Sequence, residues 1–201
     1  MVVNRDIVLK HIEDSIEVKK KLASTSLDTI VQVASEIILA YRRGNKVVWF
    51  GNGGSAADAQ HLSAELVGKF YRTRRALDSI ALTTNTSILT AVANDFDFNE
   101  VFDRQVEAIV KQGDVVIGIS TSGKSPNVIT AMKRANNLGA ITVALTGANA
   151  EKMRADYVIA VPSTYTPHIQ ESHIMIGHIL CYLVDEGLFG ESQNSKEGGK
   201  R

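Results

Sequence analysis

The sequence predicts an α/β fold with an open, doubly wound sheet of five parallel strands. Five short β-rich runs alternate with helical patterns along the chain, at residues 46–50, 79–84, 115–120, 141–146 and 157–161. The third and fourth runs are apolar at consecutive positions, which is typical of strands covered on both faces. A central sheet with helices on both sides therefore accounts for the pattern.

Helical patterns flank the five strands at both ends. Two amphipathic helices are expected before the first strand, over residues 6–23 and 27–43, and a longer one after the last strand, over 169–188. Gly44 and Gly139 each follow a helical pattern, where glycine commonly ends a helix.

The first helical pair carries an apolar stripe that includes Ile12, Ile16 and Leu22. These side chains would either cover the sheet or face a partner chain in an oligomer. A helical stripe alone does not distinguish a core from an interface, so both alternatives remain at this point.

Length and composition indicate one domain. The chain has 201 residues, of which 44% are hydrophobic, enough for one substantial core and slightly long for two. We place this single domain, including the helical pair, at residues 1–189. Residues 190–201 are polar and are expected to form a flexible tail.

The charge balance argues against a nucleic-acid partner. Twenty-two basic residues face 22 acidic ones, so the chain lacks the basic footprint of a nucleic-acid binder. Its one local basic cluster is interpreted as a solvated loop and consists of Lys69, Arg72, Arg74 and Arg75.

The chain is expected to be cytoplasmic. Its single cysteine, Cys181, lies in an apolar run, which excludes an internal disulfide and indicates a buried thiol in a reducing compartment. Residues 4–6 are polar where a signal peptide would need an apolar run, and no segment is expected to span a bilayer.

A glycine-rich turn follows the first strand. Gly51, Gly53 and Gly54 allow a ligand to approach the main chain, and Ser55 is expected to cap a helix whose free N–H groups attract anions. The run 51–56 also fits the dinucleotide fingerprint G-x-G-x-x-A. That alternative is disfavoured because the second strand does not end in the acidic residue that would hold a ribose.

A second turn, rich in hydroxyls, follows the third strand. Taken from Gly118 it fits the P-loop pattern, but none of the five strands ends in the aspartate that a P-loop enzyme needs for magnesium. Four hydroxyls around a glycine at the carboxyl end of a strand instead favour a cradle for one phosphate: Ser120, Thr121, Ser122 and Ser125.

Acid, base and metal candidates lie on two helices. His61 and Glu65 are four residues apart and share one helical face, an arrangement that is common on solvent-facing helices. Polar side chains also interrupt the apolar helix near the end of the chain. These are Gln170, Glu171, His173 and His178, and geometry alone does not choose among them.

Together these motifs closely resemble phosphoheptose isomerases, the sedoheptulose 7-phosphate isomerases of the sugar-isomerase (SIS) fold. The resemblance covers nearly the whole chain except the tail. The matching segments are residues 51–61, 64–66, 93–95, 120–127 and 169–173.

The resemblance implies a flavodoxin-like SIS domain with N-terminal helices for oligomerisation. The implied enzyme converts sedoheptulose 7-phosphate into D-glycero-D-manno-heptose 7-phosphate, which supplies the heptoses of bacterial surface polysaccharides such as lipopolysaccharide. It also implies a homotetramer with active sites at subunit interfaces.

The resemblance further implies individual roles. Glu65 would be the base that moves a proton between C1 and C2 through an enediol, and His178 would be the acid/base on the oxygens. One zinc ion per subunit would be held by His61, Glu65, Gln170 and His178. The sugar phosphate would be bound by Asn52, Gly53, Ser55, Asn94, Asp95, Gln170 and the four hydroxyls of the second turn.

Two other functions stay open on the sequence alone. A non-catalytic SIS protein acting as a replication-initiation regulator through protein binding is disfavoured, because the chain retains His61, Glu65, Gln170 and His178 together. An isomerase of another sugar phosphate is the second alternative, because the sequence does not show the depth of the pocket.

Overall fold

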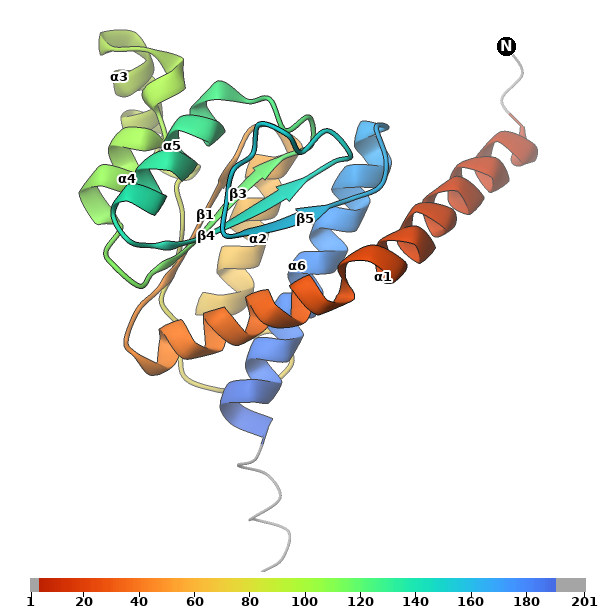
Figure 1. Ribbon diagram of the computed structural model, residues 1–201, viewed down its shortest axis with the longest axis horizontal. Helices are drawn as coiled ribbons and strands as arrows, with labels where there is room; N and C mark the ends of the chain where they lie inside the picture. The colour runs from red at the N-terminus through yellow and green to blue at the C-terminus, as the bar shows by residue number, and fades with distance from the viewer. Residues whose placement is uncertain (1–3, 191–201) are drawn as a thin grey trace, which may run out of the picture.

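A computed structural model describes residues 4–190 of the chain. The sheet has five parallel strands in the order β2-β1-β3-β4-β5, which confirms the predicted fold class. Figure 1 shows this sheet at the centre of the molecule with helices around it. The strands are β1 (Val47–Gly51), β2 (Ser79–Ala81), β3 (Val115–Ser120), β4 (Ile141–Thr146) and β5 (Tyr157–Ala160). The predicted tail at 190–201 lies outside the described residues, except for Gly190.

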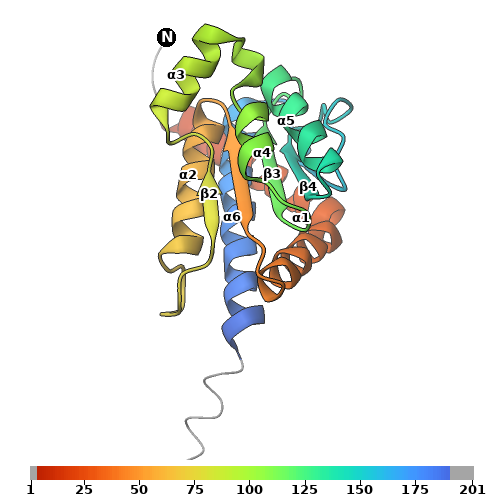
Figure 2. The same ribbon diagram turned by 90° about the vertical axis from the view of Figure 1, so that its left-hand side faces the viewer.

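Helices cover both faces of the sheet. One face packs against α1 (Arg5–Arg42), α2 (Gly54–Val67) and α6 (Thr166–Phe189), and the other against α4 (Asp103–Ile109) and α5 (Pro126–Asn137). The helix α3 (Thr86–Asp95) and the short 3-10 helix η1 (Phe98–Glu100) connect β2 to α4, and Figure 2 shows α3 at one end of the molecule. Each face has its own apolar core, and β1 and β3 are fully buried between them.

The strand order reverses between β1 and β3. From β1 the chain moves to one side to form β2 and later returns to the other side of β1 to form β3, so the order reverses at this point. Gly51 at the end of β1 lies beside Ile119 near the end of β3. In open α/β sheets ligands bind where the strand order reverses, outside the carboxyl ends of the strands.

The two expected N-terminal helices are one continuous helix. The predicted break near residues 24–26 is wrong, because this stretch contains no glycine or proline and its hydroxyls bond back to the preceding turn. Ser24 Oγ donates to the carbonyl of Lys21 (2.7 Å), and Thr25 Oγ1 lies near the same carbonyl (3.2 Å). Such bonds let serine and threonine stay inside a helix.

The apolar stripe of α1 divides into two parts. Leu22 is buried in the core, whereas Ile12 and Ile16 remain about half exposed. The amino-terminal part of α1 projects from the body of the molecule (Figure 1). The continuous helix also overturns the expectation that no segment is long and apolar enough to span a bilayer. Core helices of soluble proteins have the same length and composition, and 33% of the most apolar stretch of α1 is buried in this structure.

The glycines that were predicted to end helices do so, whereas the predicted length of β2 was wrong. Gly44 and Gly139 follow α1 and α5 with φ of +82° and +77°, as expected of glycines that end helices. β2 stops at Ala81, three residues short of the predicted end, because the chain turns there. After this turn Asn85 caps α3, its side chain accepting from the N–H of Ile88.

Cys181 is buried and free, as predicted, and burial raises the pKa of its thiol to about 12.

Candidate active site

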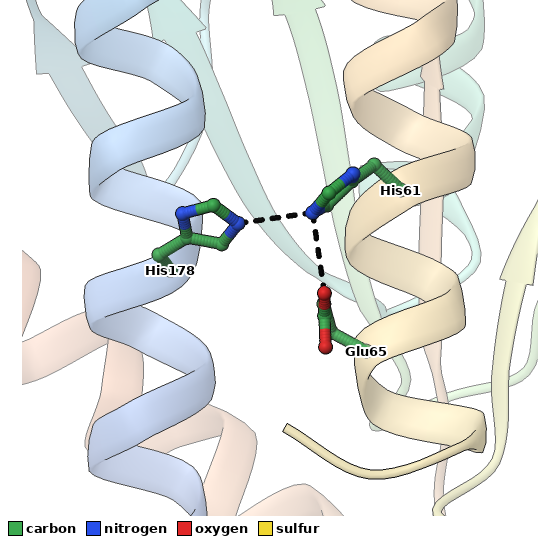
Figure 3. Close-up of side chains that lie close together, drawn as sticks. All are labelled: His61, Glu65 and His178. Carbon is green, nitrogen blue, oxygen red and sulfur yellow. Dashed lines mark hydrogen bonds and ion pairs between the residues drawn. The ribbon is translucent and has the colours of Figure 1, made fainter. Parts of the chain in front are cut away.

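Three of the predicted site residues meet between α2 and α6 (Figure 3). His61 Nε2 lies 3.2 Å from Glu65 Oε1 and 3.0 Å from His178 Nε2. One ligand atom from each residue lies within 4.8 Å of the others, so the group can hold a metal ion. Among the described residues this is the one His/Cys/Asp/Glu cluster with such spacing.

Close packing of the two helices brings these side chains together. Figure 3 shows α2 and α6 side by side, with His61 and Glu65 on one and His178 on the other. Gly177 faces Leu62, and a Cβ on Gly177 would approach the Leu62 side chain to 2.3 Å. The glycine therefore permits the short distance between helices that the cluster requires. The ring of Phe70 also stacks on the His178 ring (centroids 5.5 Å apart).

Gln170 lies apart from this cluster in the structure. A Cβ on Gly54 would meet Gln170 Nε2 at 2.4 Å, so the amide packs on the first turn of α2. Eight residues separate Gln170 from His178 on one helix, a rise of about 12 Å. The structure thus brings together three of the four residues that the resemblance implies as zinc ligands and places the fourth beside the glycine turn.

The hydroxyl-rich turn closes on itself at the start of α5. Ser120 Oγ and Ser125 Oγ are 2.9 Å apart, and Ser122 Oγ accepts from the N–H of Lys124 (3.2 Å). Gly123 has φ +62°, and a Cβ there would meet the carbonyl of Asn149. Ser125 is the N-cap of α5 but makes no side-chain capping bond, so its hydroxyl is not committed to the helix.

The two turns are joined side by side. Asn52 and Asn127 exchange two amide hydrogen bonds, of 2.9 and 3.0 Å, between the glycine turn and the first turn of α5. The expectation that Ser55 caps α2 is wrong, because Gly53 with φ +57° is the N-cap and makes no side-chain bond. Ser55 is instead buried in the first turn, directly beside Gly51.

Asn94 and Asp95 lie at the exposed end of α3. Asn94 Nδ2 donates to Asp95 Oδ1 (2.8 Å), and no hydrogen bond among residues 4–190 joins either side chain to the two turns or to the cluster. The structure therefore does not bring these two predicted sugar-binding residues into the site of a single chain.

Two further titratable groups lie near the site: Asp58, which the sequence did not single out, and His173, which was one of the open candidates on the last helix. Burial raises the pKa of Asp58, one turn before His61, to about 6, against an opposing effect of His61. Burial lowers the pKa of His173 to about 4, and its Nε2 lies 3.2 Å from the carbonyl of Thr146. His173 is thus a neutral core residue, whereas the position of Asp58 on the α2 face could have been found from its spacing to His61.

Comparison with known proteins decides the family. A family model described as SIS domain matches residues 10–147. A phosphoheptose isomerase from Aquifex aeolicus is 55% identical over 181 residues, which cover 89% of this chain and 95% of that protein. The chain belongs to the phosphoheptose isomerase family. The recognition and the fold predicted from the sequence are both confirmed by this membership.

Solved structures of the family agree with the architecture. A phosphoheptose isomerase from Neisseria gonorrhoeae matches with a TM-score of 0.85 and 40% identity, covering 90% of this chain and 98% of that chain. One from Francisella tularensis matches with a TM-score of 0.88 and 34% identity, covering 92% and 100%. The phosphoheptose isomerase fold therefore extends over almost the entire described part of this chain.

Proposed function

We propose that this protein interconverts sedoheptulose 7-phosphate and D-glycero-D-manno-heptose 7-phosphate. The convergence of His61, Glu65 and His178 in one cluster is the observation that carries the proposal. The protein's membership of the phosphoheptose isomerase family supports both the reaction class and the substrate. The aldose product is a precursor for heptoses of bacterial surface polysaccharides.

The cluster has the chemistry that an aldose–ketose isomerase needs. The proton next to a sugar carbonyl is weakly acidic, so a positioned carboxylate must remove it while a donor stabilises the enediolate oxygen. Glu65 is the proposed base between C1 and C2, and His178 is the proposed acid/base on O1 and O2. Glu65 is partly buried, which limits competition from water.

Zinc is the metal we propose for this cluster, at one ion per subunit. Two imidazole nitrogens and one carboxylate oxygen are a common donor set of catalytic zinc sites, and here they lie within 4.8 Å of one another. His61, Glu65 and His178 would hold the ion, which would supply a Lewis acid for the substrate oxygens. Gln170 lies beside Gly54 and is proposed as a contact to the sugar.

The paired turns are the proposed phosphate site. Ser120, Thr121, Ser122 and Ser125 surround the start of α5, where main-chain N–H groups attract an anion. Gly54, in the adjoining turn, is seven residues before His61, about 10 Å along α2. A substrate that reaches from the phosphate site to the cluster must therefore be an elongated sugar phosphate. Asn52, Gly53 and Ser55 would line its path.

We propose a homotetramer in which a neighbouring copy completes each site. A cavity of about 430 Å³ opens beside His178 and is otherwise lined by apolar side chains, namely Phe70, Ile174, Met175, Ile179 and Tyr182. Tyr182 and Ile179 are exposed, as are Ile12 and Ile16 of α1, and such apolar surface favours burial against another copy. Asn94 and Asp95 would reach a site from such a copy. A cytoplasmic location fits a soluble biosynthetic enzyme.

The function is tested by assaying the purified protein against a panel of C5 to C7 ketose phosphates. We expect the highest kcat/KM for sedoheptulose 7-phosphate. A preference for a shorter ketose phosphate would replace the proposed substrate, and no isomerisation of any member would contradict the proposed activity.

Metal and assembly need separate measurements. Elemental analysis of freshly purified protein should find about one zinc per chain, and chelation should lower activity in proportion to the zinc lost. Full activity in zinc-free protein would remove zinc from the proposal.

Light scattering should give the mass of four chains, and a monomeric mass would contradict the proposed assembly.

A further inference from the structure

A buried ion pair joins the ends of α2 and α6 two turns below the His61, Glu65 and His178 cluster. Arg74 Nε donates to Asp185 Oδ1 over 2.8 Å, and their side chains are 2% and 0% exposed. The sequence had suggested a solvated loop for the basic residues 69–75, and for Arg74 that interpretation is wrong. The guanidinium of Arg74 lies inside the protein because the carboxylate of Asp185, on α6, pairs with it there.

Arg74 binds the end of the helix that carries the proposed base. Its guanidinium donates to the carbonyls of Glu65 (3.0 Å) and Leu66 (2.8 Å), which belong to the last turn of α2. Carbonyls in a last helical turn have no partner within the helix, and a cation there also interacts favourably with the helix dipole. Arg74 thus holds the main chain of Glu65 itself.

Asp185 connects the same group to α6. Its second oxygen, Oδ2, accepts from the N–H groups of Tyr71 and Arg72, both at 3.1 Å, so all of the carboxylate is engaged. Asp185 follows His178 by seven residues, two helical turns and about 10 Å along the helix. The contact therefore fixes how far α6 can slide or turn relative to α2.

We propose that Arg74 and Asp185 are positioning residues for the isomerase reaction. Neither touches the substrate; together they set the distance between Glu65 on α2 and His178 on α6. This inference rests on the proposed function. If Glu65 and His178 move by a fraction of their contact distance to the substrate, kcat falls strongly. The hydroxyl-rich turn is distant from Arg74 and Asp185, so phosphate binding and KM should change little.

The test uses Arg74→Lys, which keeps the charge but cannot reach the Asp185 carboxylate and two carbonyls with one planar fork. Its control is Arg134→Lys. Arg134 forms two bonds to Asp103 (3.1 and 2.8 Å), between α5 and α4 on the opposite face of the sheet, and its side chain is 39% exposed against 2% for Arg74. Both variants are assayed well below their melting temperatures.

For Arg74→Lys we expect kcat for sedoheptulose 7-phosphate to fall about 10- to 100-fold with KM within about threefold of wild type. For Arg134→Lys we expect both constants within about twofold. A kcat for Arg74→Lys within twofold of wild type, or an equal loss in both variants, would overturn the proposal. If Arg74→Lys does not fold, Asp185→Asn replaces it with the same expected results.

A second readout separates this proposal from the proposed function. The affinity of the metal-free protein for Zn²⁺, measured by competition with a chelator, should drop about 10- to 100-fold in Arg74→Lys and remain unchanged in Arg134→Lys. Wild-type protein without isomerase activity would defeat the proposed function alone. An active wild type with equal Zn²⁺ affinity in both variants would defeat the positioning role alone.

Discussion

The strands β1 and β3 lie side by side, and polar side chains gather at both of their ends. The two ends differ in how far these polar groups are satisfied by bonds within the protein. At the amino end, Asp114 accepts from Lys46 Nζ (2.6 Å) and from the N–H groups of Lys46 and Lys111. At the carboxyl end, Ser120 and Ser125 bond chiefly to each other. The first end satisfies its polar groups internally, whereas the second keeps hydrogen-bonding capacity for a ligand.

This difference separates stability from function along one pair of strands. A buried carboxylate that receives several donors fixes the loops around it and has nothing left to offer a substrate. Hydroxyls at a helix start, next to glycines that expose the main chain, are adapted to an anion. The following changes test that division, beginning with the largest expected effect.

Asp114→Ala should destabilise the protein by about 3 kcal/mol, because it leaves the largely buried Lys46 side chain and several N–H groups without their acceptor. The kcat of the folded protein should stay within twofold of wild type. Urea denaturation gives the stability and a steady-state assay gives kcat. A stability loss below 1 kcal/mol, or a change in kcat of tenfold, would break the comparison.

The same residue predicts a pH dependence. Burial by itself raises the pKa of Asp114, but the hydrogen bonds from Lys46, Lys111 and Asn45 outweigh it and hold the pKa below its ordinary value. Its stabilising contribution is therefore present above about pH 4 and is lost as the pH falls through the lowered pKa. Denaturation curves between pH 2 and 7 should show a shallower acid slope for Asp114→Asn than for wild type.

Ser120→Ala should act on binding instead. We expect KM to rise about tenfold, or about 1.4 kcal/mol, with kcat changed less than threefold and stability changed by less than 1 kcal/mol. Thr130→Ala removes a hydroxyl at an exposed position of α5, one turn after Pro126, and as the control should change neither constant. An unchanged KM for Ser120→Ala would show that the hydroxyls belong to the turn and not to a ligand.

Asp58→Asn should have the smallest effect of these changes on the free energy of unfolding. It should stabilise the protein, whereas Asp114→Ala should destabilise it. Asp58 has one buried oxygen that no donor among the described residues reaches, and burial raises the pKa of its carboxyl to about 6. Ionisation therefore destabilises the folded protein increasingly from about pH 4 to pH 6 and constantly above that. At pH 7.5 the variant should be more stable by about 1 kcal/mol, allowing for solvent screening, and the gain should vanish below pH 4.

The sequence was informative wherever a short pattern has one physical cause. Short β-rich runs between helical patterns located all five strands, and the glycines at 44 and 139 marked helix ends, because burial and positive φ each restrict the residue types strongly. The serine-rich turn was located in the same way. Its position beside the glycine turn became known only from the structure, in which β1 and β3 pair in parallel.

Long-range packing was the part that a linear pattern could not reveal. The choice of His178 over Glu171 as the partner of His61 depends on the register of α2 against α6, which Gly177 and Leu62 set across more than 100 residues. The burial of Arg74 depends on Asp185 in the same way. The sequence predicted two helices, over 6–23 and 27–43, where the structure has one, because the hydroxyl side chains between these ranges bond within the helix and let it continue.

The most direct test of the account is isomerisation of sedoheptulose 7-phosphate in D₂O by wild type and Glu65→Gln, followed by NMR of the product. The glutamine keeps the size of the side chain but removes the base. Wild type should place solvent deuterium at C2 of the aldose, and Glu65→Gln should lose at least a hundredfold in turnover while keeping its melting temperature within a few degrees. Equal turnover and equal labelling by both proteins would contradict Glu65 as the proton-transferring group.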